Sequence, residues 1–154
     1  MEITLLAVGR LRPAYRAACD DYSRRIGRQA RFTEIEVREA SRAPTIAVQR
    51  EEEAVRLRAR LPAGATLVCL ARDGSGWTSE ELARRLGRWR DAARPLAFAI
   101  GGSSGLADSL LQSASARWSL GPVTLPHELA RVVVVEQIYR GFTILRGEPY
   151  HKGR

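Results

Sequence analysis

Residues 95–105 read PLAFAIGGSSG, a short apolar run that ends in a glycine-rich loop. An apolar run of this length, bounded by Pro95 and Gly101, is typical of a strand that is buried on both faces. Similar apolar runs occur at Glu2–Val8 and at Thr66–Ala71. Strands of this kind belong to parallel sheets with helices on both faces. The stretch therefore predicts an α/β fold.

Helical patterns lie between these strands. Pro13 suits the first turn of a helix, and Thr78 with Glu81 forms a capping box. The predicted helices start at Pro13, span Thr45–Leu61, run from Thr78 through Trp89, and span Ala107–Ala116 and His127–Leu145; the predicted strands are Glu2–Val8, Phe32–Val37, Thr66–Ala71, Pro95–Ile100 and Trp118–Leu120. Strands that alternate with helices predict βαβ units and a mainly parallel sheet with helices on both faces.

Length and composition limit the class of protein. A chain of 154 residues with 45% hydrophobic content predicts one globular domain, residues 1–154. Purely apolar runs such as Val132–Val135 are far shorter than the roughly 18 residues of a membrane span. The N-terminus lacks the features of a secretory signal, so we expect a cytoplasmic protein with no membrane partner. Cys19 and Cys69 are expected to be free thiols, and the spacing of the two histidines predicts no metal site.

The charge balance favours a polyanionic partner. Lysine and arginine total 25 against 17 acidic residues, which gives a net charge of +8, and Lys152 is the only lysine. Arginine forks match phosphate oxygens and stack on bases. The excess favours nucleic acid as the partner, with acidic small molecules and anionic surfaces as alternatives.

Three loops are candidates for a ligand site. They follow Leu70, Ile100 and Leu120, at predicted carboxyl ends of strands, where α/β sheets bind ligands. The loop 101–105 is neither a dinucleotide fingerprint nor a phosphate-binding P-loop. By itself it could equally be a plain tight turn. Together, the three loops could wrap a partly apolar ligand such as a nucleoside.

The C-terminal third is rich in polar and aromatic residues. His127 and Arg131 lie four residues apart, on one face of the predicted helix. The tail Pro149–Arg154 carries tyrosine, histidine, lysine and arginine without an acid. Such side chains suit a base and a phosphate. The simpler alternatives are a local hydrogen bond for His127 and fraying for the tail.

Four strings together make the chain recognisable. They are FAIGGSSGL at 98–106, LPHELAR at 125–131, EQIYR at 136–140 and GEPYHK at 147–152. The chain resembles, over its whole length, the ribosomal RNA large subunit methyltransferase H family, which belongs to the SPOUT (trefoil-knot) methyltransferases. The resemblance implies a homodimer with a C-terminal trefoil knot and S-adenosyl-L-methionine as cofactor. It also implies N3-methylation of a pseudouridine in the helix 69 loop of 23S rRNA, on the assembled 70S ribosome.

The resemblance also implies site residues. The family's cofactor contacts correspond to Leu70, Gly102, Leu120, Gly121, Pro122, Val123, Thr124 and Leu125. These positions belong to the same three strand ends. The chain departs from the family at Ala71, where members often carry aspartate.

The chemistry of the implied reaction assigns roles to the remaining candidates. The N3 proton of pseudouridine must leave, so a base is needed, and His127, or His151 from the second subunit, is the expected proton acceptor. Arg131 and Arg140 are expected to stabilise the imide anion and hold phosphates. Tyr139, Tyr150, Lys152 and Arg154 are expected to bind RNA.

Two alternatives and one expected interface accompany this interpretation. The alternatives are a non-enzymatic basic RNA-binding module of the ribosome and an α/β enzyme that acts on a small anionic metabolite. For the homodimer, we expect contact through apolar faces of the first and last helices, including Val132–Val135.

Overall fold

The computed structural model describes residues 1–152 and shows one five-stranded sheet. The strand order is β2-β1-β4-β3-β5, and every pair of neighbouring strands is parallel. The strands are β1 Glu2–Val8, β2 Arg31–Val37, β3 Thr66–Gly76, β4 Leu96–Ile100 and β5 Ala116–Ser119. The predicted parallel sheet is confirmed, and all five residues of β4 are buried.

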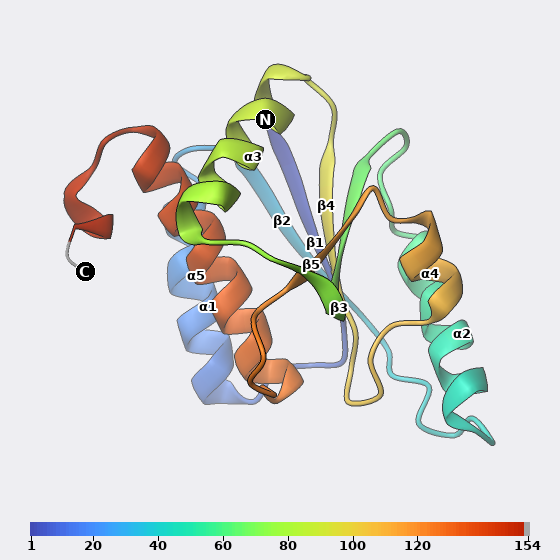
Figure 1. Ribbon diagram of the computed structural model, residues 1–154. Coiled ribbons are helices and arrows are strands. Elements are labelled where there is room, and N and C mark those ends of the chain that lie inside the picture. The colour runs from blue at the N-terminus through green and yellow to red at the C-terminus, as the bar shows by residue number, and fades with distance from the viewer. Residues whose placement is uncertain (153–154) are drawn as a thin grey trace.

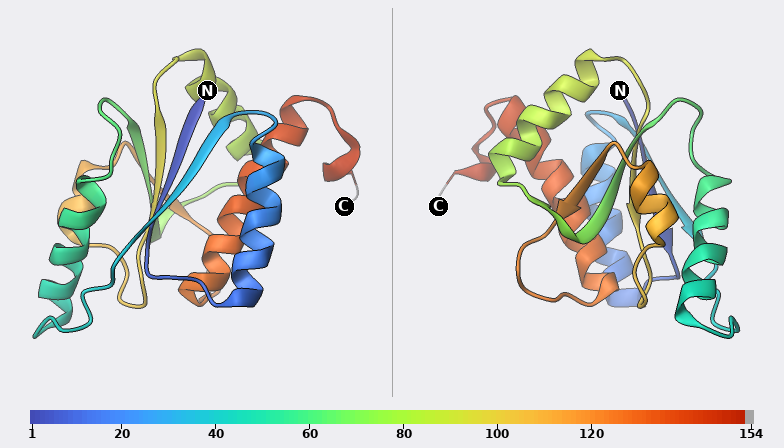
Figure 2. Two further views of the ribbon diagram at one scale, coloured as in Figure 1. Left: turned by 180° about the vertical axis from the view of Figure 1, so that it is seen from behind. Right: turned by 45° about the vertical axis from the view of Figure 1, so that its right-hand side comes forward.

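Helices cover both faces of the sheet, as predicted (Figure 1, Figure 2). One layer contains α1 Pro13–Ile26, α3 Ser79–Asp91 and α5 His127–Leu145, and the other contains α2 Ile46–Arg58 and α4 Asp108–Ser113. A short 3-10 helix, η1 Pro149–His151, follows α5. The α/β fold class is therefore confirmed, whereas the C-terminal knot stays a prediction.

Two hydrophobic clusters hold these layers together. On the α1–α3–α5 face, Phe98 of β4 packs with Trp118 of β5 and with Leu86 and Ile138 of the covering helices. The other cluster lies between the sheet, α2 and α4. Val134 and Val135 belong to the first cluster and are fully buried. The expectation that the whole valine run faces a second subunit is therefore wrong, because half of it packs on the sheet.

The ends of several elements differ from the sequence prediction. The predicted strand end at Ala71 is wrong: Asp73–Gly76 belong to β3, because Ser75 and Gly76 pair with β5. Gly74 is needed for this approach: a Cβ there would lie 2.7 Å from the carbonyl carbon of Arg117. The helices α2 and α4 both end three residues earlier than expected.

The helix starts were predicted more accurately than the element ends. The Thr78 capping box is present in both directions, with Glu81 as its partner, and the Thr45 side chain accepts a hydrogen bond from the Val48 N–H. The bounds of α5 are those predicted. Both cysteines are free and buried.

Two searches of residues 1–152 gave negative results. No helix there has the length and apolar character needed to cross a membrane. Within the same residues, no cluster of three or more histidine, cysteine, aspartate or glutamate side chains is arranged to hold a metal ion.

Candidate functional site

Two of the three candidate loops, those after Ile100 and Leu120, lie at one edge of the sheet, and the residues after Leu70 form an irregularity within β3 beside β5. Parallel pairing places the carboxyl ends of β4, β3 and β5 side by side. The loop Gly101–Gly105 follows β4 and is closed by a hydrogen bond from the Gly105 N–H to the Gly102 carbonyl (3.1 Å). We call this end of the sheet the carboxyl edge. The structure thus brings together the segments that the sequence selected, although Leu70 lies within β3 and not at its carboxyl end.

The loop Gly101–Gly105 is held in position by polar contacts from outside it. Arg50 of α2 donates to the Ser104 carbonyl, and the Ser103 hydroxyl lies 3.2 Å from the Glu39 carboxylate. A Cβ on Gly102 would lie 3.1 Å from Cγ1 of Val8, at the end of β1. The backbone at Gly102 therefore lies closer to its neighbour than a side chain comfortably permits.

The segment after β5 supplies the other predicted cofactor positions. Leu70, Leu120 and Leu125 are half-buried, as is Gly102. Between the last two leucines, the residues Gly121, Pro122, Val123 and Thr124 are exposed. Val123 leaves 66% of its surface exposed, which is high for a large apolar residue. The edge thus combines glycine backbone with accessible apolar side chains, the composition expected of a small-molecule site.

His127 is the first residue of α5 and directly follows this segment. It is half-buried. The adjacent Glu128 accepts from the Arg12 backbone N–H (2.7 Å) and from the Arg12 Nε (2.8 Å). Those hydrogen bonds, the backbone one first, lower the pKa of Glu128. The N-terminus of α5 is thereby tied to the chain after β1, and His127 stays at the carboxyl edge.

Arg131 is buried, although the sequence analysis expected it to act on the substrate. Its side chain is only 1% exposed, and its Nη2 donates to the carbonyls of Val8 (3.2 Å) and Gly9 (2.8 Å). Its Nη1 donates to the carboxylates of Glu34 (3.0 Å) and Glu36 (2.7 Å) of β2. The guanidinium therefore has its partners inside the chain, and this geometry favours positioning of α5 over contact with a substrate.

The remaining candidates gather at the opposite end of α5. Glu136 pairs with Arg140 (2.6 Å) and accepts from the Tyr150 hydroxyl (2.9 Å). The Arg140 guanidinium lies over the Tyr150 ring, 4.7 Å from its centroid. The Tyr139 ring meets the Tyr150 ring edge-on at 4.8 Å. We call Glu136, Tyr139, Arg140, Tyr150 and His151 the tail cluster.

His151 is oriented by two charged neighbours. Its Nε2 lies 2.8 Å from Oε1 of Glu80 in α3, and its Nδ1 lies 3.4 Å from Nη1 of Arg140. A carboxylate accepts and a guanidinium donates, so these partners favour a proton on Nε2 and a lone pair on Nδ1. His151 and the backbone N–H of Glu80, the latter first, lower the pKa of that carboxyl.

The tail is docked on the body of the protein. Burial, followed by hydrogen bonds with Tyr22 and Glu136, raises the pKa of Tyr150, so it is the neutral phenol that contacts Glu136. Lys152 is exposed. Arg154 lies outside the described residues. Fraying, the simpler alternative for this segment, does not describe Tyr150 and His151.

Sequence reasoning missed partners that complete the tail cluster. The ring centroids of Tyr22 in α1 and Tyr139 lie 6.0 Å apart, and Glu80 of α3 pairs with His151. Both residues come from elements far from the tail in sequence. Glu136 stood out only as a polar position on α5, and its spacing of four from Arg140 is the one signal that predicts their ion pair.

The comparisons with known proteins agree on one family. The family described as "Predicted SPOUT methyltransferase" matches residues 1–151. A ribosomal RNA large subunit methyltransferase H of Anaeromyxobacter sp. (strain Fw109-5) is 44% identical, over 99% of this chain and 100% of that protein. The protein of the same name from Gemmatimonas aurantiaca is 46% identical, with the same coverage of both chains.

Solved structures show the same fold. A "Probable Methyltransferase" from Bordetella pertussis Tohama I superimposes with a TM-score of 0.58 at 18% identity, covering 91% of this chain and 95% of that one. The SpoU methyltransferase AviRb from Streptomyces viridochromogenes, in complex with the cofactor AdoMet, has a TM-score of 0.50 at 14% identity, covering 90% of this chain and 57% of that chain.

Proposed function

Since this chain belongs to the ribosomal RNA large subunit methyltransferase H family of SPOUT methyltransferases, we propose that it methylates 23S rRNA. The donor is S-adenosyl-L-methionine, and the acceptor is N3 of a pseudouridine in the helix 69 loop of the assembled 70S ribosome. The observation that carries the proposal is the full-length similarity to relatives of that name. The similarity covers the carboxyl edge at one end of α5 and the tail cluster at the other. A ribosomal substrate places the protein in the cytoplasm.

The carboxyl edge fits the cofactor. The close approach of Gly102 to Val8 leaves backbone, not a side chain, on that part of the edge. Leu70, Gly102 and the segment Leu120–Leu125 would hold the cofactor there. Their accessible apolar groups and backbone N–H groups suit a nucleoside with a polar tail. When bound, S-adenosyl-L-methionine supplies an electrophilic methyl group on its sulfonium.

Two groups of the chain can remove the imide proton. His127 lies at the carboxyl edge itself. His151 carries its lone pair on Nδ1, beside the Arg140 guanidinium, and this lone pair can accept the proton from N3 when Arg140 turns from it to the pseudouridine carbonyls. Arg140 then lies where it can stabilise the negative charge that develops on the pseudouridine carbonyls.

The distance between the two ends of α5 argues for a homodimer. His127 and Arg140 are separated by about 20 Å along the helix, at ~1.5 Å per residue. One chain cannot bring its carboxyl edge and its tail cluster to the same nucleotide. Two copies with antiparallel α5 helices would place the tail cluster of one beside the carboxyl edge of the other, in a two-fold arrangement.

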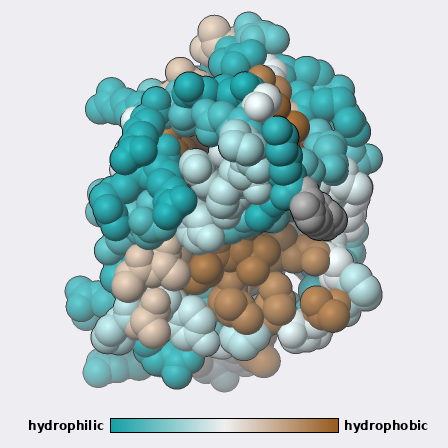
Figure 3. All heavy atoms as spheres, turned by 90° about the vertical axis from the view of Figure 1, so that its left-hand side faces the viewer, coloured by the Kyte–Doolittle hydropathy of each residue, from teal (hydrophilic) through white to brown (hydrophobic). Residues whose placement is uncertain are grey.

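The face needed for such a dimer is apolar. In the N-terminal half of α5, Leu129, Val132 and Val133 are half-buried. Figure 3 shows apolar side chains gathered on this side of the molecule. Contiguous apolar surface of this kind marks an interaction site. We therefore assign the dimer contact to α5 and α1.

The test is methyl incorporation from labelled S-adenosyl-L-methionine into 70S ribosomes, followed by mass spectrometry of the rRNA nucleosides. Calorimetric titration with S-adenosylhomocysteine measures cofactor binding separately. We expect saturable binding and one N3-methylpseudouridine per ribosome. Ribosome binding without cofactor affinity would instead identify a non-enzymatic RNA-binding module, and methyl transfer without RNA would identify a metabolite enzyme.

A further inference from the structure

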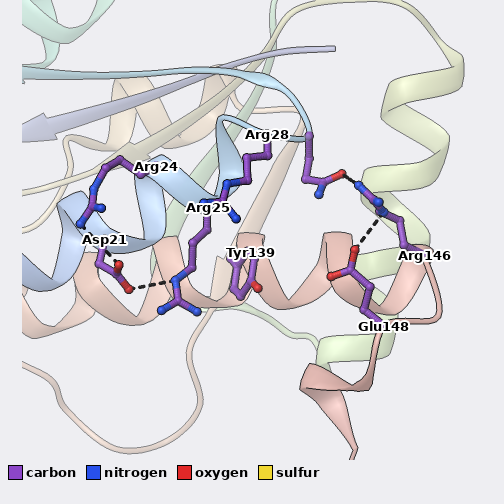
Figure 4. Close-up of a pocket in the computed structure, with 8 residues that line it drawn as sticks. Asp21, Arg24, Arg25, Arg28, Tyr139, Arg146 and Glu148 are labelled. Atoms are coloured by element: carbon purple, nitrogen blue, oxygen red, sulfur yellow. Dashed lines mark hydrogen bonds and ion pairs between the residues drawn. The ribbon is translucent and has the colours of Figure 1, made fainter.

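A cavity of about 550 Å³ lies between the C-terminal ends of α1 and α5, outside the site described above. Four of its lining side chains are arginines, Arg24, Arg25, Arg28 and Arg146, and Tyr139 forms part of its wall. Figure 4 shows these side chains, which come from α1, α5 and the turns that follow both helices. We call this feature the arginine pocket.

The arginine pocket carries an excess of positive charge. Its acidic side chains are Asp21 and Glu148. Asp21 pairs with Nε of Arg25 (2.9 Å) and with Nη2 of Arg24 (3.4 Å), and Glu148 pairs with Nε of Arg146 (2.9 Å). Within residues 1–152, no carboxylate forms an ion pair with Arg28. Four guanidinium groups against two carboxylates leave the pocket suited to an anion.

The two carboxylates orient the arginines. The ion pairs of Arg25 and Arg146 engage the Nε side of the guanidinium, which leaves the terminal N–H groups of Arg25 directed away from Asp21 (Figure 4). The side chains stay accessible: Arg24 is 77% exposed and Arg146 is 55% exposed. Guanidinium groups that are accessible and held in place are the donors that recognise phosphate oxygens in pairs.

We propose that the arginine pocket binds backbone phosphates of the structured RNA substrate. The inference rests on the proposed function, because it takes RNA as the substrate class. Tyr139 connects the two sites: it lines the pocket, and its ring contacts Tyr150 of the tail cluster. An RNA strand held by its phosphates in the pocket therefore passes directly to the tail cluster.

Position also favours RNA over the dimer partner as the occupant. The pocket lies at the C-terminal ends of α1 and α5. The half-buried apolar residues assigned to the dimer contact lie in the N-terminal half of α5. In the proposed antiparallel dimer, the pocket of one copy would flank the shared site.

The experiment compares two variants with equal loss of charge. The test variant is Arg24→Gln with Arg28→Gln, and the matched control is Arg58→Gln with Arg60→Gln, at the end of α2 on the opposite face of the sheet. All four residues are exposed. Ribosome binding is measured by filter assay, and methyl transfer by its kcat and KM. Both are measured at salt concentrations between about 0.05 and 0.3 M, over which the screening of exposed charges increases.

We expect only the test variant to lose RNA affinity. Each phosphate contact contributes a slope of about 0.7–0.9 to log K against log salt, which corresponds to roughly fivefold at 0.1 M salt. The test variant should raise the Kd and KM by about fivefold or more, lower the salt slope by about 1–2 and leave kcat unchanged. The control should match the wild type, and thermal unfolding should be the same for all three proteins.

Three results would overturn the proposal. Equal losses in both variants would show that only overall charge matters, and no loss in either would show that the pocket does not bind the substrate. A loss on ribosomes that disappears on naked 23S rRNA would point to an acidic protein surface. Failure of the proposed function looks different: the wild type itself would lack S-adenosylhomocysteine affinity and methyl transfer, while the filter assay would still test the pocket.

Discussion

Replacing Arg131 with methionine tests whether this residue positions α5 or contacts the substrate. The side chain is 1% exposed and donates four hydrogen bonds, to two carboxylates and two backbone carbonyls. Methionine keeps the apolar stem and removes the guanidinium. We expect the protein to lose stability, because two carbonyls lose a charged donor at the end of β1.

The magnitude follows from the partners that remain. Removing one member of a buried ion pair costs about 3–5 kcal/mol. Arg16 still pairs with Glu34 (2.8 Å) and also contacts Glu36, so neither carboxylate is left without a cation. We therefore expect the free energy of unfolding to fall by about 3 kcal/mol, the low end of this range. For an m value of ~2 kcal/mol/M, the urea midpoint should fall by roughly 1.5 M.

The assay is urea unfolding, combined with methyl transfer in the absence of denaturant. Arg88→Met is the control, since Arg88 lies exposed on α3 and such surface changes stay within about 0.5 kcal/mol. An Arg131→Met protein with unchanged stability and abolished methyl transfer would refute the positioning role. That result would restore the role predicted from sequence, a guanidinium that acts on the RNA.

Four further expectations follow from the structure. Gly102→Ala should weaken S-adenosylhomocysteine binding by ~tenfold, about 1.4 kcal/mol, because the new Cβ presses on Val8, while the protein still folds. Unchanged calorimetric affinity would show that this loop is not part of the cofactor site. Burial raises the pKa of Cys19 to about 11 and of Cys69 to about 12. Ellman's reagent at pH 8 should therefore label neither thiol until the protein unfolds, and stability should fall as pH rises above 9, where only the unfolded thiols ionise. Sedimentation at micromolar concentration should show a dimer, and a 17.1 kDa species alone would contradict the shared site. Deleting Tyr150–Arg154 should abolish methyl transfer while sparing dimerisation, and full turnover by the truncated protein would leave catalysis to His127.

Most of the fold could be predicted from local pattern. Apolar runs gave the strands, and Pro13 and Thr78 mark helix starts that the structure reproduces. The error at Asp73–Gly76 has a clear cause. The glycines there have the composition of a turn, yet Gly74 serves a close approach to β5 that only tertiary pairing reveals.

The candidate site was predictable in part. Parallel strands must present their carboxyl ends together, so Gly102 and Leu120 lie at one edge for a topological reason, and Leu70 lies beside β5 through its pairing with Trp118. The helical spacing of His127 and Arg131 correctly gave one face of α5. It could not show that this face meets the two glutamates of β2, because contacts between distant segments leave no local pattern. The sequence therefore grouped His127 with Arg131, although Arg131 is buried against β2 and His127 is only half-buried.

The docked tail gives the homodimer proposal a physical basis. After α5 the chain turns at Gly147 (φ +66°) and returns to contact the helix it has just left. Tyr150 and His151 are thus held by Glu136 and Glu80 of their own chain before any second copy arrives. Side chains that are ordered in advance lose less conformational entropy on association. A dimer that joins two such tails to two carboxyl edges would form its sites from groups already in place, which is the condition for positioning an acceptor nitrogen against a methyl donor.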